Sequence, residues 1–255
     1  MTTLTALLTA LAAATMLTLE AAPPIKNVPT LDTTAVGDSS SVTFGGLTYV
    51  NKGLVGVGNF SASALDSRGD TLGSFSSFKI DTNTWRKNAD GSYAGSLYTL
   101  PDRGYNVAGL IDYAARIQKF DLAFTPDYTT NTVGQTQLTL TFKGTTKITD
   151  FNGNATTAVN PTGTTLSGFT NVPTASVGGV TKFTVDGEGL AIRADGSFYI
   201  SDEYGASIYH VSKTGQMQGV ITPVQALIPQ FSNPAYTGFT TESAAIATGI
   251  QTGGR

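Results

Sequence analysis

The chain contains no cysteine and only one histidine among its 255 residues. The absence of cysteine excludes a disulfide framework and any chemistry that uses a thiol. Charged residues make up 13% of the chain, against roughly 25% in an average domain, and no run of lysine and arginine occurs. Since the net charge is −3, the chain lacks the basic surface of a nucleic-acid-binding protein, and no nucleic acid is expected as a partner.

Helical patterning is also scarce. Few segments repeat apolar residues at a period near 3.6 over several turns. The chain is instead rich in threonine, serine, valine and isoleucine, with 10 tyrosines and 13 phenylalanines, and the β-branched and aromatic types favour pleated strands. The composition therefore predicts an all-β protein.

The amino terminus has a composition of its own. Residues 4–19 form an uncharged run of mainly leucine and alanine, followed by small residues and prolines. Such a run is typical of a secretory signal peptide, although no basic residue precedes it. It is short for a membrane anchor, and a packed amphipathic helix is the other alternative. We expect a signal peptide over 1–22, a linker over 23–42 and a secreted protein without stable membrane association after cleavage.

Two sequons, at Asn59 and Asn154, agree with a secreted glycoprotein.

Residues 188–223 contain the clearest structural unit. Four short apolar runs, separated by tight glycine-containing turns, lie at 189–193, 197–201, 207–212 and 216–221. Four antiparallel strands joined in this way are typical of one blade of a β-propeller. Further strands are expected at 47–50, 54–60, 75–80, 96–100, 116–124 and 137–142, whereas the Gly-, Thr- and Asn-rich residues 153–180 are expected to form a long surface loop.

An internal echo supports a repeated architecture. Residues 45–49 parallel 188–192, and residues 96–104 parallel 197–205, so that each copy pairs a Gly-Leu strand with an aromatic strand ending in an acidic turn. The preserved order favours blades over chance similarity or a β-sandwich. We therefore expect a β-propeller-like domain over 43–255 with four-stranded antiparallel blades. An incomplete ring is expected, because the sequence ends in a Thr-, Ala- and Gly-rich stretch.

Four carboxylates lie close together in the sequence, each beside a glycine or at a strand end: Asp186, Glu188, Asp202 and Glu203. Oxygen ligands without cysteine, and with only one histidine in the chain, suit calcium better than zinc. The alternative is structural, because acidic residues at turns often accept hydrogen bonds from the backbone. The two interpretations are balanced for Glu188 and Asp202, whereas Asp186 and Glu203 favour the structural one.

The chain resembles the phytase-like family, "esterase-like activity of phytase", in its fungal secreted form. The resemblance covers roughly residues 44–255 and rests on four stretches: Gly-Asn-Phe-Ser-Ala-Ser-Ala-Leu-Asp at 58–66, Leu-Pro-Asp-Arg-Gly-Tyr-Asn at 100–106, Asp-Gly-Glu-Gly-Leu at 186–190 and Ser-Asp-Glu-Tyr-Gly at 201–205. It implies a β-propeller-like domain whose aspartates and glutamates carry hydrolysis of a phosphate ester or diester. In the family an Asn-x-Gly-Phe-Glu-Gly-Leu stretch usually follows a segment like 240–255. This sequence ends before it, so we expect a truncated form.

These residues support metal-assisted hydrolysis of a phosphorylated small molecule or a phosphodiester. Glu188 and Asp202 are the strongest candidate metal ligands, with Asp186 and Glu203 as further ones. Asp102 is a further ligand or base, and Arg103 could clamp a phosphate in bidentate fashion.

A Ser-His-Asp hydrolase is disfavoured, because His210 lies within an expected strand and no Gly-x-Ser-x-Gly motif is present. The alternative function is a non-catalytic β-propeller that binds a partner, for example at the cell wall. An enzyme predicts that Asp102, Glu188 and Asp202 converge around one cation. A binding module predicts that each carboxylate is held by backbone donors in a turn of its own.

Overall fold

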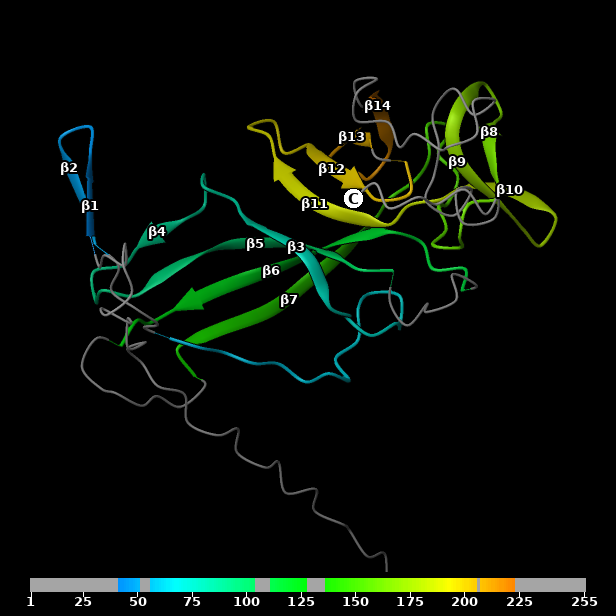
Figure 1. Cartoon of the computed structure of the whole chain (residues 1–255). Helices are drawn as coiled ribbons and strands as arrows, with labels where there is room; N and C mark the ends of the chain where they lie inside the picture. Colours follow the sequence, from blue (N-terminus) through cyan, green and yellow to red (C-terminus); the bar gives the residue numbers. More distant parts are fainter. Residues whose placement is uncertain (1–40, 51–55, 104–110, 128–135, 206, 223–255) are drawn as a thin grey trace, which may run out of the picture.

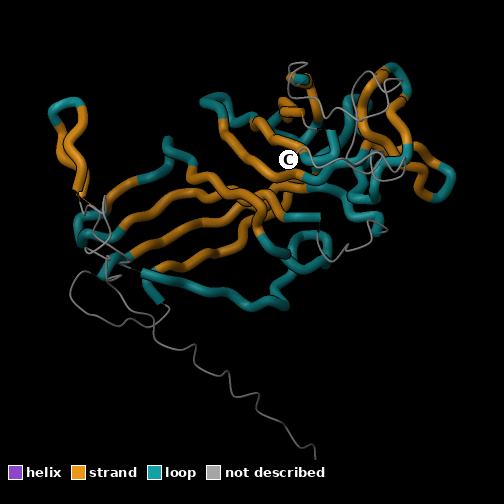
Figure 2. Tube along the Cα trace, viewed as in Figure 1, coloured by secondary structure: helices purple, strands orange, loops and turns teal. Residues whose placement is uncertain are grey.

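A computed structural model describes residues 41–50, 56–103, 111–127, 136–205 and 207–222 (Figure 1). Within these ranges every regular element is a β-strand, which confirms the all-β class (Figure 2). The strands are β1 (Ser41–Phe44), β2 (Leu47–Val50), β3 (Phe75–Ile80), β4 (Arg86–Lys87), β5 (Tyr93–Pro101), β6 (Arg116–Phe124), β7 (Leu138–Lys147), β8 (Gly163–Leu166), β9 (Phe169–Val177), β10 (Val180–Phe183), β11 (Gly187–Ile192), β12 (Phe198–Asp202), β13 (Ser207–Val211) and β14 (Met217–Ile221). The described residues include no helix long and apolar enough to span a membrane.

Strands β11 to β14 form one antiparallel sheet in chain order. This sheet confirms the four-stranded unit predicted for residues 188–223. Its alternating pattern buries Phe198 and Ile200 on one face of β12, with Tyr209 of β13 on the same side. These side chains belong to a core that also includes Leu100 and Ile117 from the neighbouring sheet, so the two sheets share one apolar interior.

The neighbouring sheet has the strand order β3-β5-β6-β7, and the short β4 also pairs with β5. One half of the face turned away from the shared core is apolar, because Leu97 of β5 lies opposite Phe120 of β6. The Phe120 ring lies 5.7 Å from the rings of Phe75 and Phe142, measured between centroids. The other half is polar, since Thr99 pairs with the buried Gln118.

Residues 153–180 were expected to form a long surface loop, and this prediction is wrong. They contain β8 and β9, which form a third sheet with β10 in the order β10-β9-β8. Leu166 of β8, Val172 of β9 and Phe183 of β10 are buried in the shared core. The threonine-rich composition resembles a loop, yet threonine is β-branched and suits a strand when its neighbours are covered.

The first half of the sequence echo does not correspond in structure. Residues 45–49 belong to the hairpin of β1 and β2, which stands apart from the other sheets (Figure 1). The strand beside β5 is β3, so β3 takes the place that β11 has beside β12. The second half holds, because β5 and β12 both follow the first strand of their sheets.

Several sequence predictions remain open. Of the strand expected at 54–60, residues 54 and 55 lie outside the described residues, and the rest makes only an isolated bridge between Gly58 and Thr136. The signal peptide over 1–22, almost all of the linker and residues 223–255 also lie outside them. The described sheets are open, and the ring of a propeller remains a prediction.

Five turns share a single geometry. In each, the first residue donates its N–H to the carbonyl of the fifth, and a glycine at the fourth position donates back to the first; the turns are 66–70, 88–92, 150–154, 193–197 and 212–216. The glycines have φ between 82° at Gly196 and 98° at Gly215. Other residues are strained in this left-handed region, so the repeated glycine explains why these positions turn.

A buried ion pair fastens the first of these turns to the sheet. Arg116 of β6 donates to Asp66 Oδ2 at 2.5 Å and to Asp70 Oδ2 at 2.7 Å. Gln118 also donates to Asp66 Oδ2, at 3.1 Å. The ring of Tyr113 lies 4.0 Å from the Arg116 guanidinium. Because Asp66 and Arg116 are both almost completely buried, each depends on the other for its charge compensation.

The substitution Asp66→Asn should lower the free energy of unfolding by about 3 kcal/mol near neutral pH, because Arg116 loses a buried partner. Burial alone would raise the pKa of Asp66, but hydrogen bonds from Arg116, the Arg68 N–H and Gln118, together with the charge of Arg116, lower it below its usual 3.8. The additional free energy of unfolding of the wild type, relative to Asp66→Asn, is therefore fully present above the usual pKa of 3.8. It is lost as the pH falls through the lower pKa of Asp66 in the folded protein.

Urea unfolding of both proteins between about pH 7 and about pH 3 measures this difference. An advantage that stays constant over the whole range would contradict the ion-pair assignment.

Candidate functional site

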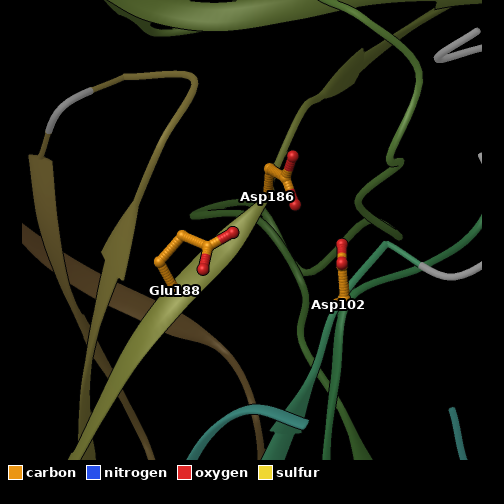
Figure 3. Close-up of side chains that lie close together, drawn as sticks. All are labelled: Asp102, Asp186 and Glu188. Atoms are coloured by element: carbon orange, nitrogen blue, oxygen red, sulfur yellow. The ribbon is translucent and has the colours of Figure 1, made fainter. Parts of the chain in front are cut away.

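Three carboxylates meet where β5 ends and β11 begins. Asp102 directly follows β5, Asp186 directly precedes β11, and Glu188 is the second residue of β11. One oxygen of each lies within 4.8 Å of one oxygen of each of the others. Figure 3 shows the three side chains turned toward a common space. The structure thus joins two stretches that are 84 residues apart by residue number.

A glycine allows this approach. A Cβ atom on Gly187 would lie 2.8 Å from Leu100 Cδ2 and 3.2 Å from Leu100 Cγ. Leu100 is 1% exposed and belongs to the shared core. Because Gly187 separates Asp186 from Glu188, and Leu100 is two residues from Asp102, this contact sets the distance between the acidic groups.

Asp186 is the buried member of the cluster, with 3% of the residue exposed. Its Oδ2 lies 3.3 Å from Arg103 Nε. Its Oδ1 is buried and has no hydrogen-bond partner among the described residues. Burial raises the pKa of Asp186 to about 6, and the charges of Asp102 and Glu188 add to this, while the charge of Arg103 and a hydrogen bond from the Arg103 N–H oppose it.

The other two carboxylates lie nearer the surface. Glu188 is exposed, and a hydrogen bond from Ser76 holds its carboxylate. Partial burial and the charge of Asp102 raise the pKa of Glu188. Asp102 Oδ1 accepts from the Arg103 N–H at 2.6 Å, and the Asp102 N–H donates to Ser74 O at 3.0 Å. The cluster therefore has one closed side at Asp186 and one open side at Glu188.

Arg103 connects the acidic cluster to neighbouring side chains of the protein. Besides Asp186, its guanidinium contacts Tyr204 OH at 2.5 Å and Asn160 Oδ1 at 3.1 Å, both through Nη1. The guanidinium also lies 5.7 Å from the centre of the Tyr204 ring. With its side chain 28% exposed, Arg103 still reaches solvent, but two of its nitrogens already hold protein groups. Its role as a phosphate clamp stays a prediction.

Asp202 and Glu203 lie outside the cluster of three. Asp202 Oδ1 accepts from the Asp186 N–H at 2.8 Å, and Oδ2 accepts from the Gly205 N–H at 2.7 Å and from Tyr209 OH at 3.3 Å. Burial raises the pKa of Asp202 to about 7, and the charge of Asp186 adds to it, against the hydrogen bonds. The Glu203 N–H donates to Asp186 O at 2.9 Å.

The geometry thus differs from the ranking expected from the sequence. Asp186, expected to be structural, lies in the cluster, and Asp202, expected to be a leading ligand, accepts backbone hydrogen bonds. Tyr204, Asn160 and Ser76 were not anticipated as part of the site. Tyr204 belongs to the Ser-Asp-Glu-Tyr-Gly stretch, which could have indicated it, whereas no sequence signal marks the other two.

The remaining candidate, His210, lies within β13 as expected. Its Nε2 is 3.0 Å from Ser197 Oγ and 3.2 Å from Arg193 Nη1. The histidine thus contacts side chains at the two ends of the 193–197 turn and does not join the acidic cluster.

The donor set fits a hard divalent cation. Three carboxylates provide oxygens only, which calcium and magnesium prefer. A buried carboxylate oxygen without a partner is unfavourable, and a bound cation would compensate it together with the mutual repulsion of the three groups. Asp102, Asp186 and Glu188 are therefore the residues that could hold a cation.

Comparison with known proteins places the chain in a family. Residues 57–251 match the family described as "Phytase-like: Esterase-like activity of phytase". The chain belongs to this phytase-like family. A protein of Arthroderma benhamiae described as "Uncharacterized secreted protein" is 36% identical over 201 residues, which cover 73% of this chain and 39% of that relative. The matched region thus spans about two fifths of the relative's length. No solved structure matches the chain.

The substitution Gly187→Ala should destabilise the phytase-like chain by about 1–3 kcal/mol, because the new methyl group overlaps the buried Leu100 side chain. Gly144→Ala in β7 is the matched control, since a Cβ there meets nothing within 4 Å and should change stability by less than about 0.5 kcal/mol. Urea unfolding of the two variants tests the assignment. Equal stabilities would show that Gly187 does not set the approach of the strands.

Proposed function

We propose that this phytase-like protein is a secreted phosphoesterase that holds a divalent cation, calcium in the first instance, between Asp102, Asp186 and Glu188. The observation that carries the proposal is the buried Oδ1 of Asp186, which has no partner among the described residues and belongs to a cluster with two further carboxylates. Secretion is supported by the amino-terminal apolar run and by the description of the fungal relative as secreted.

The two sides of the cluster have different roles in this proposal. Asp186 and Arg103 form the closed side, where the ion pair orients one oxygen of the carboxylate and leaves the other for a cation. Glu188 and Asp102 form the side nearer solvent, from which a substrate phosphate can approach. A divalent cation at such a site polarises a phosphoryl oxygen and lowers the pKa of bound water. The substrate class is a phosphorylated small molecule or a phosphodiester.

One observation favours a second candidate, a cation-stabilised binding module without catalysis. Arg103 is the cationic side chain that directly contacts the cluster, and Asp186, Tyr204 and Asn160 already engage it. A phosphate would therefore have to share Arg103 with these groups. In a binding module the cation would stabilise the fold without supporting turnover.

Calcium should raise the thermal midpoint of the wild-type chain, because a ligand that binds only the folded state stabilises it. At about 100 times its dissociation constant the ion contributes about 2.7 kcal/mol, or a shift of roughly 5–10 °C for a chain of this size. Asp186→Asn should abolish the shift, whereas the surface variant Asp121→Asn should retain it. Differential scanning calorimetry with calcium and with chelator measures all three proteins.

Hydrolysis of bis(p-nitrophenyl) phosphate by the same proteins separates the two candidates. The phosphoesterase predicts calcium-dependent turnover that Asp186→Asn removes. A thermal shift without turnover supports the binding module. The cation site is wrong if calcium shifts neither the wild type nor Asp121→Asn.

A further inference from the structure

The turn at residues 202–205 holds the main chain of Asp186 on both sides. The Asp186 N–H donates to Asp202 Oδ1 at 2.8 Å, and the Asp186 carbonyl accepts from the Glu203 N–H at 2.9 Å. Both partners belong to one short segment, since Asp202 ends β12 and Glu203 directly follows it. The backbone of Asp186 is therefore fixed relative to this turn in two directions.

The same turn controls the Asp186 side chain through Arg103. Asp186 Oδ2 pairs with Arg103 Nε at 3.3 Å, and Arg103 Nη1 donates to Tyr204 OH at 2.5 Å. The Tyr204 hydroxyl lies 3.0 Å from both Ala158 O and Asn160 Oδ1 and donates its single proton to one of them. Since Tyr204 is 3% exposed, its buried ring gives the guanidinium a rigid support.

Asp202 also fixes the shape of the turn itself. Its Oδ2 accepts from the Gly205 N–H at 2.7 Å, across the turn, and from Tyr209 OH at 3.3 Å. The residue is 4% exposed. Both oxygens of this carboxylate are thus occupied by protein donors, so Asp202 acts on the cluster through the backbone of Asp186.

These contacts account for three of the four polar groups of Asp186, and Oδ1 has no hydrogen-bond partner among the described residues. A carboxylate beside two others experiences repulsion, which favours rotation away from them unless other contacts oppose it. The N–H, the carbonyl and Oδ2 provide those contacts. The N–H and the carbonyl bond directly to Asp202 and Glu203, and Oδ2 is connected to Tyr204 through Arg103.

We infer that the 202–205 turn is the positioning element of the cation site, with Asp202 and Tyr204 as positioning residues that hold Asp186 for the cation without touching it. This inference rests on the proposed cation site. Outer partners of metal ligands typically contribute 10- to 100-fold to metal affinity. Such an effect differs from a loss of stability, because it persists in protein that is fully folded.

Isothermal titration with calcium tests the inference on the full chain. Tyr204→Phe keeps the ring and removes only the hydroxyl that supports Arg103; Asp202→Asn keeps the shape and replaces one acceptor by a donor. Each should weaken calcium binding about 10- to 100-fold at a temperature where the variant is folded. Thr156→Val is the matched control, because it removes another buried hydroxyl, which donates to Ile148 O at 3.1 Å outside the site. It should lower the thermal midpoint and leave the calcium affinity unchanged.

A second measurement does not depend on the cation. Hydrogen exchange of the Asp186 N–H should be slow in the wild type and faster in Asp202→Asn, relative to neighbouring amides of β12. Wild-type calcium affinity in both variants would overturn the positioning role while leaving the cation site intact. No calcium binding by the wild type would overturn the cation site. In that case hydrogen exchange alone tests the positioning of Asp186 by Asp202. Equal exchange rates of the Asp186 N–H in the wild type and in Asp202→Asn would refute it.

Discussion

The packing of Leu100 against Gly187 is the constraint on which the site depends. It brings the end of β5 against the start of β11, although the two strands belong to different sheets. The apolar partner is part of the core shared by all three larger sheets. The position of the acidic groups therefore follows from hydrophobic packing beneath them, and the free energy that opposes their repulsion comes from burial of apolar surface.

Two aspartates in equivalent positions show how strongly tertiary surroundings decide a role. Asp102 follows β5 and Asp202 ends β12, each at the end of the second strand of its sheet. Asp202 is covered by the start of β11 and by Tyr209, so its oxygens meet N–H and O–H donors. Asp102 instead faces Glu188 and Asp186. Similar strand-and-turn sequences can therefore place one carboxylate among hydrogen-bond donors, as for Asp202, and the other in the acidic cluster, as for Asp102.

The features that could be predicted from the sequence are those that local residues specify, and the features that depend on tertiary surroundings could not be predicted. Strands 75–80 and 116–124, and the four-stranded unit after residue 187, were predictable because local alternation and glycine turns specify them. The strands within 153–180 were not predicted, because threonine is frequent there and is only partly apolar. The apolar alternation that indicates a strand is therefore weak in this stretch. Carboxylates beside glycines indicated acidic groups at the start of β11, and the structure adds Asp102 to Asp186 and Glu188 there. The different surroundings of Asp186 and Asp202 were not predictable, since the pairing of Asp186 with Arg103 and of Asp202 with the Asp186 N–H joins separate parts of the sequence.

The divided face of the sheet formed by β3, β5, β6 and β7 has a consequence for how the strands align. Arg116, Gln118 and Phe120 alternate along β6, with polar partners at one end and aromatic rings at the other. A slip of two residues would preserve which side chains point to this face, so alternation alone cannot prevent it. It would, however, place the Gln118 amide among phenylalanines and separate Arg116 from Asp66. The buried charge thereby selects a single alignment of β6 during folding, at a point where hydrophobicity gives several acceptable ones.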